Sequence, residues 1–207
     1  MKILIAVPCM DLVPAQFASS LATLRKVGDC VVAFQMGSLI YNSRNDLAKK
    51  AIASECDYIL WLDSDMVFDP DTLEKLIADR ESGDIISGLY FRRVQPFSPV
   101  AFSQLQITEQ GGCIWKNQET IPGEIFPVEG CGFGCVLMPV SAVADVIAKF
   151  GNAFAPICGV GEDLSFCWRA RQCGYKIVCD PRIKLGHVGH HVITEQFYES
   201  FKNVRAA

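Results

Sequence analysis

Two aspartates separated by a single residue follow an apolar run in the first third of the chain. Asp63 and Asp65 flank Ser64, directly after the run 58–62. If that run is a buried strand of an α/β sheet, both carboxylates lie at its carboxyl end, where such sheets bind ligands. Carboxylate oxygens are the ligands that Mg²⁺ and Mn²⁺ prefer. The pattern predicts a divalent-cation site with room for phosphate oxygens. Ordinary turn residues before the next helix are an alternative of similar weight.

A second acidic pair begins an expected helix near residue 162. Glu162 and Asp163 follow a glycine-rich loop and precede an amphipathic stretch that runs to residue 173. The positive end of a helix dipole favours a carboxylate and opposes a rise in its pKa, which suits a general base. We expect Asp163, or else Glu162, to be a catalytic base, with helix capping as the structural alternative for one of them.

All three histidines of the chain lie between residues 187 and 191. Clustered imidazoles just after a strand favour a ligand role. Strand alternation would place His187 and His191 on one face and His190 on the other, so only one side can reach an ion at the aspartates. A surface cluster or a separate zinc site is the minority alternative, because no cysteine or carboxylate completes a zinc set at the usual spacing.

The glycine-rich run 130–135 differs from a dinucleotide-binding fingerprint. Cys135 stands where the last glycine would be, and a strand follows where the fingerprint needs a helix. We expect Gly132, Phe133 and Gly134 to bring backbone close to a sugar or a phosphate, with a tight turn as an equal alternative.

Asp63 also fits the nucleophile of a phosphohydrolase of the haloacid dehalogenase type, in which the first of two aspartates attacks a phosphoryl group. That motif normally follows the first strand, whereas 58–62 is the third strand expected here. The later lysine and paired acidic motif of such enzymes have no clear counterpart. An EF-hand does not fit, because Val67 and Phe68 occupy positions that need an oxygen ligand and a glycine. The phosphohydrolase remains the alternative enzyme.

The elements that must position these residues alternate through residue 91. Short apolar runs at 3–7, 30–34, 58–62 and 84–90 predict buried strands. Amphipathic stretches at 14–27, at 42–54 and from 69 onward predict helices. We expect Asp69 to cap the last of these helices and Pro70 to occupy its first turn. The alternation predicts an α/β fold with a doubly wound, mostly parallel sheet.

The second half of the chain lacks this alternation. Residues 92–128 predict irregular or antiparallel structure, with short strands at 100–105 and 113–115. The remaining expected elements are a strand at 133–138, helices at 140–150 and 163–173, a strand at 175–178 and a final helix at 194–204. No repeat or linker divides the chain, so we expect one domain over residues 1–207.

The composition is that of one globular unit. Of 207 residues, 50% are hydrophobic and 20% charged, and the formal net charge is −4. Basic residues are scattered, at most as short pairs and without a long run, which argues against a dedicated nucleic-acid binder or a polybasic membrane anchor. The ten cysteines include no Cys-x-x-Cys pair and are interpreted as buried thiols of a reducing compartment. Without a signal core or an apolar run of membrane-spanning length, we expect a cytoplasmic protein, with peripheral docking on a membrane left open.

Taken in this order, the motifs resemble those of the A-type (GT-A) glycosyltransferases, especially the small family-2-like enzymes. The segments that carry the resemblance are 5–8, 41–45, 58–66, 132–134, 161–167 and 186–187. The resemblance implies a metal-dependent enzyme that moves a sugar from a nucleoside-diphosphate sugar to an acceptor hydroxyl. Attack opposite the leaving group would invert the anomeric carbon, which is the expected outcome, and retention stays open because retaining enzymes of this fold also place acidic residues nearby. It also implies a nucleotide-binding half over residues 1–91 and an acceptor and catalytic half over residues 92–207.

The resemblance further implies a role for each motif residue. Asp65, with Asp63 and His187, would bind Mn²⁺ or Mg²⁺, and Asp163 or, less favoured, Glu162 would take the acceptor proton. The residues expected to contact the nucleotide sugar are Pro8, Gln35, Arg44, Asn45, Asp63, Ser64, Gly132, Phe133 and Gly134. A UDP-sugar is the expected donor. Many relatives place an acidic residue against uracil where this chain has Gln35, so another base stays open.

The acceptor remains open among a glycan, a lipid-linked sugar, a protein, a small molecule and a modified nucleic-acid base, the last being disfavoured by the weak basic character. The stretch 92–124, with Phe97, Phe102 and Trp115, is expected to contact the acceptor or to close over it. A non-catalytic domain that binds a nucleotide sugar is a further alternative to the transferase.

Overall fold

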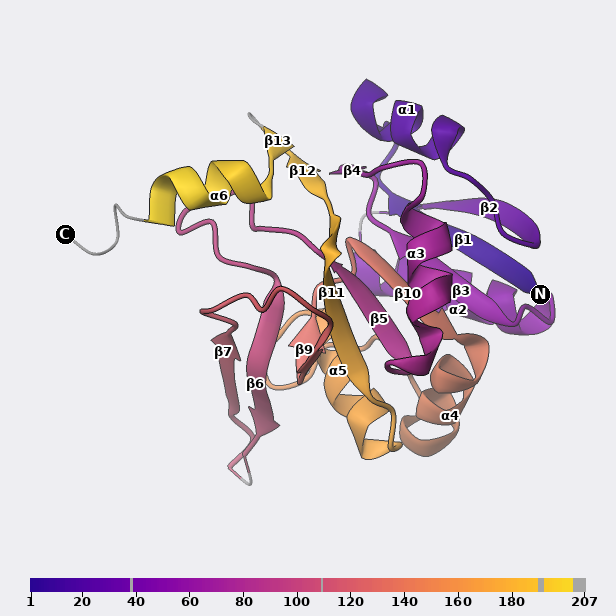
Figure 1. Cartoon of the computed structure of the whole chain (residues 1–207). Coiled ribbons are helices and arrows are strands. Elements are labelled where there is room, and N and C mark those ends of the chain that lie inside the picture. The colour runs from indigo at the N-terminus through magenta and orange to yellow at the C-terminus, as the bar shows by residue number, and fades with distance from the viewer. Residues whose placement is uncertain (38, 109, 190–191, 203–207) are drawn as a thin grey trace.

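The computed structural model describes residues 1–37, 39–108, 110–189 and 192–202. Its centre is a seven-stranded sheet with the order β2-β1-β3-β10-β5-β11-β8 (Figure 1). Strands β10 and β8 run antiparallel to their neighbours and the other strands are parallel to one another. The strands of this sheet are β1 (Lys2–Cys9), β2 (Asp29–Met36), β3 (Tyr58–Leu62), β5 (Ile85–Leu89), β8 (Phe126–Val128), β10 (Cys135–Pro139) and β11 (Ile177–Lys184). The predicted α/β fold with a mostly parallel sheet is confirmed.

Helices cover both faces of the sheet, because strand residues alternate between two apolar clusters. Ile3 and Ile5 of β1 pack with α1 and α3, whereas Leu4 and Ala6 pack with α2, α4 and α5. These helices are α1 (Ala15–Thr23), α2 (Ile40–Ala53), α3 (Thr72–Ala78), α4 (Val140–Phe150) and α5 (Glu162–Gln172), and a 3₁₀ turn, Asp79–Glu81, follows α3. Across the described residues, every helix is too short or too polar to traverse a bilayer.

Two small sheets accompany the central one. One has the order β7-β6-β9 and the other β13-β12-β4. Their strands are β4 (Met66–Val67), β6 (Ala101–Ile107), β7 (Cys113–Asn117), β9 (Gly130–Cys131), β12 (Gly186–Val188) and β13 (Val192–Ile193), and helix α6 (Glu195–Lys202) follows them. The pairing of β4 with β12 places His187 opposite Met66, next to Asp65 in the chain. The antiparallel structure expected between residues 92 and 128 is confirmed.

Local sequence signals predicted several elements with their observed bounds, including β3 and α4. The start of α3 was predicted wrongly. Asp71 occupies its N-cap position and makes no side-chain capping hydrogen bond. The Asp69 carbonyl accepts a hydrogen bond from the Thr72 amide, so Asp69 and Pro70 form a turn that precedes the helix.

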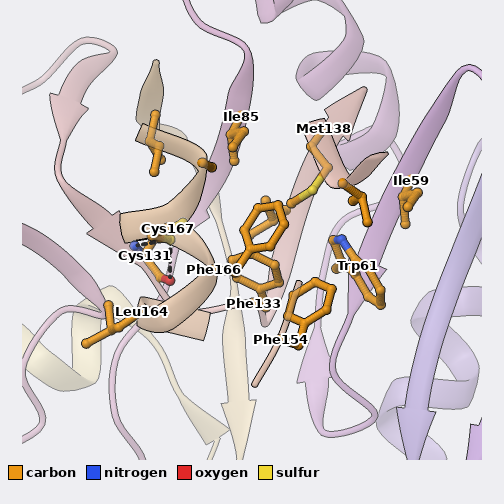
Figure 2. Packing of buried hydrophobic residues seen from close by; sticks show 14 of the residues in the cluster. Ile59, Trp61, Ile85, Cys131, Phe133, Met138, Phe154, Leu164, Phe166 and Cys167 are labelled. Atoms are coloured by element: carbon orange, nitrogen blue, oxygen red, sulfur yellow. Dashed lines mark hydrogen bonds between the residues drawn. The ribbon is translucent and has the colours of Figure 1, made fainter. Parts of the chain in front are cut away.

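An aromatic cluster fills the core between the sheet and helices α2, α4 and α5 (Figure 2). The Phe154 and Phe166 rings stack at 4.8 Å, and Trp61 meets Phe154 edge to face at 5.2 Å. Phe133 packs against both phenylalanines. The cluster sets β3 against the start of α5, the two elements that carry the acidic pairs.

The cysteines are free thiols, and most are fully or partly buried, as expected. Cys158 is the exception, because it lies exposed in the loop before α5. The prediction of buried thiols is therefore wrong at this position.

Candidate active site

The carboxyl ends of β1 and β3 meet at a cleft of about 380 Å³. In the sheet, β1 lies between β2 and β3, so the strand order changes direction at β1. Open α/β sheets bind ligands at the carboxyl ends of the strands at such a point. The predicted site residues that line the cleft are Pro8, Arg44, Asp63, Ser64, Asp65, Glu162, Asp163 and His187. Segments far apart in the sequence are thus brought to one cleft.

A buried guanidinium joins the two acidic pairs beneath the cleft. Arg44 Nη2 donates to Asp63 Oδ1 at 2.7 Å, and Arg44 Nε donates to Glu162 Oε1 at 3.0 Å. Only 2% of the Arg44 side chain is exposed, and its charge lies 5.3 Å from the Phe133 ring centre and 5.6 Å from that of Trp61. Burial opposes the charge, but the two carboxylates raise the pKa of Arg44 above its ordinary value.

The resemblance implies that Arg44 contacts the nucleotide, and Arg44 lines the cleft in which that contact is expected. Its guanidinium is held by two acids, and within the described residues only Nη1 is left without a hydrogen-bond partner. Burial raises the pKa of Asp63, and Arg44 acts against that rise. The ion pair with this buried cation occupies one of the two carboxylate oxygens of Asp63.

Asp65 and His187 face each other across the cleft. His187 Nε2 lies 3.4 Å from Asp65 Oδ2, and the Asp65 carbonyl accepts a hydrogen bond from the Val188 amide at 2.7 Å. Burial raises the pKa of Asp65, but His187 and then Arg93 bring it below its ordinary value. Burial lowers the pKa of His187, and its contact with Asp65 raises it by more. Each side chain therefore favours the charged form of the other.

The donor set fits a divalent cation that is shared with a substrate. His187 Nδ1 lies 2.9 Å from the Phe91 carbonyl oxygen, so a neutral His187 that donates there leaves Nε2 directed at Asp65. Among the described residues, no group of three His, Cys, Asp or Glu side chains converges on one point. A cation here would have Asp65 and His187 as protein ligands, and Mg²⁺ commonly completes such a shell with water and phosphate oxygens.

Arg93 occupies the outer side of the Asp65 carboxylate. Its Nη1 lies 2.5 Å from Asp65 Oδ2, and half of the Arg93 side chain is exposed. The same nitrogen is 3.4 Å from the Val188 carbonyl oxygen. A cation that binds Asp65 Oδ2 would therefore compete with this guanidinium for the same oxygen.

Asp163 lies in the first turn of α5 and lines the cleft. Its Oδ1 accepts a hydrogen bond from the Leu164 amide at 2.7 Å. The expectation that the helix end keeps the pKa of Asp163 from rising is wrong, because burial and then the neighbouring Glu162 charge raise this pKa to about 6. No side-chain cation is paired with Asp163 in the described residues, whereas Glu162 is committed to Arg44. Asp163 is thus the better placed of the two for proton transfer near neutral pH.

Several predicted binding residues lie outside the cleft lining. Asn45 is buried and its Oδ1 accepts from the Phe154 amide. Gln35 lies one strand outward, opposite Pro8 in the β1–β2 register. Phe133 belongs to the aromatic core. Asn45 and Phe133 are thus buried beneath the site, whereas Gln35 is partly exposed on β2.

Gly132 and Gly134 have a packing reason to be glycines. A Cβ on Gly132 would lie 2.1 Å from Tyr90 Oη, and one on Gly134 would lie 2.8 Å from Tyr90 Cζ. The Gly134 amide donates to Tyr90 Oη, and the Gly134 carbonyl accepts from the Asp63 amide at 3.1 Å. The glycines admit the Tyr90 ring, and the same segment fixes the backbone of Asp63.

Two predictions fall outside the described residues. These are the positions of His190 and His191, the second of which was expected to share a face with His187.

The sequence analysis missed several residues of the cleft: Cys9, Met10, Gly37, Ile40 and Arg93. Most of them follow β1 and β2 at their carboxyl ends, so the rule that located Asp63 could have located them too. Arg93 follows β5 in the same way. It was treated only as part of a short basic pair.

Comparison with known proteins shows the fold alone. No family model and no curated protein matches the sequence. The crystal structure of A197 from STIV is similar with a TM-score of 0.63 and 17% identity, covering 91% of this chain and 86% of that one. GalNAc-T7, solved with UDP, GalNAc and Mn²⁺, is similar with a TM-score of 0.59 and 11% identity, covering 91% of this chain and 43% of the other. The single α/β domain is consistent with a GT-A-like fold.

Proposed function

We propose that this protein is a glycosyltransferase that takes a sugar from a nucleoside-diphosphate sugar. The observation that carries the proposal is the convergence of Asp65 and His187 with Asp163 on one cleft of a GT-A-like fold. Residues up to 91 supply most of the donor side of this cleft. Residues from 92 onward supply Arg93, the acidic pair of α5 and His187.

In the proposed reaction, the acceptor oxygen forms a bond to the anomeric carbon of the donor sugar. The bond from that carbon to the diphosphate oxygen breaks, and its electron pair leaves with the nucleoside diphosphate. Asp163 takes the acceptor proton as general base. Arg44 holds Glu162 and Asp63 in place around that carboxylate. Attack opposite the leaving group inverts the anomeric configuration.

Asp65 and His187 would hold Mn²⁺ or Mg²⁺ on the diphosphate side of the cleft. When bound there, such a cation neutralises charge on the departing nucleoside diphosphate. GalNAc-T7 was solved with UDP and Mn²⁺, which supports a UDP-sugar with Mn²⁺ as the first pair to test.

Two other activities remain to be separated from this one. The ion pair of Asp63 with buried Arg44 weighs against a haloacid-dehalogenase-type nucleophile. A domain that only binds nucleotide sugar would show Mn²⁺-dependent binding without release of the nucleotide from the sugar, so turnover separates it from the transferase.

The test compares two variants in nucleotide binding and in turnover. Nucleoside diphosphates and their sugars are screened by thermal shift with and without Mn²⁺, since a ligand of the native state raises its apparent stability. Asp65→Asn is expected to abolish the Mn²⁺-dependent shift. Asp163→Asn is expected to keep that shift and to lose about 10²- to 10⁴-fold in nucleotide release from the sugar donor.

Other outcomes would replace the proposal. Phosphate release from simple phosphomonoesters that stops in Asp63→Asn would establish the phosphohydrolase. Nucleotide-sugar binding without turnover by the wild type would establish a binding domain. Undiminished turnover in Asp163→Asn would remove Asp163 as the base.

A further inference from the structure

A second cavity, which we call the side hollow, lies on the other flank of the turn that carries Asp163. It has a volume of about 290 Å³, and Gly161 and Leu164 line it, whereas Glu162 and Asp163 between them line the cleft. A Cβ on Gly161 would lie 2.8 Å from Asp163 Oδ1. The carboxylate of the proposed base therefore lies close to a residue of the side hollow.

The neighbouring residues Arg92 and Arg93 also line different cavities. Arg92 lines the side hollow and Arg93 lines the cleft. The two cavities therefore adjoin at two places, the pair 92–93 and the first turn of α5. A molecule in the side hollow lies next to the base without occupying the donor cleft.

The wall of the side hollow includes an exposed indole on a rigid support. Trp115 is 47% exposed, and its ring meets the Phe102 ring edge-on at 5.9 Å and 87°. Phe102 is buried in the main apolar cluster, so it fixes the indole from below. A large aromatic face left in water beside a cavity is a feature of ligand-binding surfaces.

Polar groups of both hydrogen-bonding kinds accompany the indole. Asn117 lies two positions after Trp115 on β7 and so shares its face. Asn117 Nδ2 donates to the Pro99 carbonyl at 2.7 Å, which leaves Oδ1 as the acceptor that this side chain can offer. The Arg92 guanidinium supplies donors.

We propose that the side hollow is the acceptor subsite and that its occupant is the pyranose ring of an acceptor glycoside, an inference that rests on the proposed function. A pyranose has an apolar C–H face, which packs on Trp115, and a rim of hydroxyls that both donate and accept. Those hydroxyls match Arg92 and Asn117. A ring seated there lies against Gly161, two residues before Asp163 in the chain.

The test measures sugar binding without metal or nucleotide, so it is independent of the donor site. Methyl glycosides of glucose, galactose, mannose and N-acetylglucosamine are titrated while saturation-transfer NMR and tryptophan fluorescence are recorded. At least one glycoside is expected to bind the wild type. Trp115→Ala is expected to weaken that binding by about threefold to tenfold, and Trp115→Phe by less.

Ile114→Ala is the matched control. Ile114 is 48% exposed, nearly as much as Trp115, and lies on the opposite face of the same strand. It is expected to keep wild-type binding, and equal melting temperatures would show that all variants are folded. If no glycoside binds, or if Trp115→Ala and Ile114→Ala behave alike, the proposal is overturned.

Uridine and adenosine form a second arm, because nucleobases also stack on indoles. A Trp115-dependent nucleoside signal without any glycoside signal would likewise overturn the proposal. Failure of this test leaves the Mn²⁺-dependent nucleotide shift untouched, so it is distinguishable from failure of the proposed function.

Discussion

At the scale of single residues, the site contains both opposite charges that pair and like charges that lie close together. Arg44 is buried between Asp63 and Glu162, while Asp163 is left beside a like charge. Burying a carboxylate without a cation costs free energy, and proteins tolerate that cost mainly where the group reacts. The raised pKa of Asp163 and the paired state of Glu162 support the proposal that the two adjacent acids have different tasks.

The pH dependence of turnover follows from the pKa of Asp163. A general base must be ionised, and burial together with Glu162 raises this pKa to about 6. We expect kcat/KM to be constant above that pH and to fall tenfold per unit below it. Glu162→Gln removes the like charge, so the pKa of Asp163 falls and the acidic limb moves to lower pH. A limb that stays in place, or that moves upward, would contradict the assignment of Asp163.

The contact of Arg93 with Asp65 predicts that replacing Arg93 changes the affinity for Mn²⁺. Its guanidinium lies on Asp65 Oδ2, so it repels a cation that binds there and must move aside. Arg93→Ala is expected to tighten binding of free Mn²⁺ by about twofold to fivefold, as for an exposed ion pair of ~0.5–1 kcal/mol. Electron paramagnetic resonance of unbound Mn²⁺ measures this affinity.

Arg92→Ala is the control for this prediction, because Arg92 lines the side hollow and not the cleft. Its affinity for Mn²⁺ is expected to equal that of the wild type. Weaker Mn²⁺ binding in Arg93→Ala would mean that Arg93 supports the cation site and does not compete with it.

At the scale of elements, antiparallel β10 has a central role. It lies between β3 and β5 and pairs with both, and the segment before it fixes the Asp63 amide through Gly134. The Tyr90 side chain fills the space that Gly132 and Gly134 leave open. Tyr90, which directly follows β5, therefore packs against the segment that holds the backbone of Asp63 at the end of β3.

Gly132→Ala tests that contact. The new methyl would lie 2.1 Å from Tyr90 Oη and 2.5 Å from Val100 Cγ1. We expect the free energy of unfolding to fall by about 1–3 kcal/mol, the usual cost of overpacking a core. Urea denaturation measures the change.

Gly123→Ala is the matched control, because a Cβ there meets nothing within 4 Å. It is expected to leave the free energy of unfolding nearly unchanged. Equal stability of the two variants would show that Tyr90 moves away without cost and does not hold the acidic pair.

At the scale of the whole molecule, the final helix is tied to the site through one ring stack. Tyr198 of α6 stacks on Phe91 at 4.3 Å and 19° between ring planes. The Phe91 carbonyl in turn contacts His187 Nδ1. The C-terminal helix, which Figure 1 shows beside β12 and β13, thus supports the backbone to which His187 is bonded.

Tyr198→Ala is expected to lower the free energy of unfolding by about 3 kcal/mol, since the ring is buried and its loss leaves a cavity. Thermal or urea unfolding measures this loss. Gln196→Ala, at an exposed position of the same helix, should change stability by about 0.5 kcal/mol or less. Similar stability of both variants would show that α6 is not docked through Tyr198.

The sequence by itself determined the local elements and the residues of the acidic pairs. Apolar runs such as 58–62 and the amphipathic stretch 140–150 depend on neighbours in the chain, so their bounds could be predicted. Asp63, Asp65 and Asp163 could be located because the carboxyl end of a strand and the first turn of a helix are local features. The start of α3 was missed because an aspartate in a turn resembles an aspartate in a cap.

Only the tertiary structure decided which groups meet. The ion pairs of Arg44 join residues 19 and 118 positions apart, and Arg93 reaches Asp65 across 28 positions. Such contacts depend on strand order and on which face a side chain takes, and neither is encoded in spacing along the chain. The same physical reason explains Gly132 and Gly134, which the sequence marked as unusual but which only the Tyr90 ring explains.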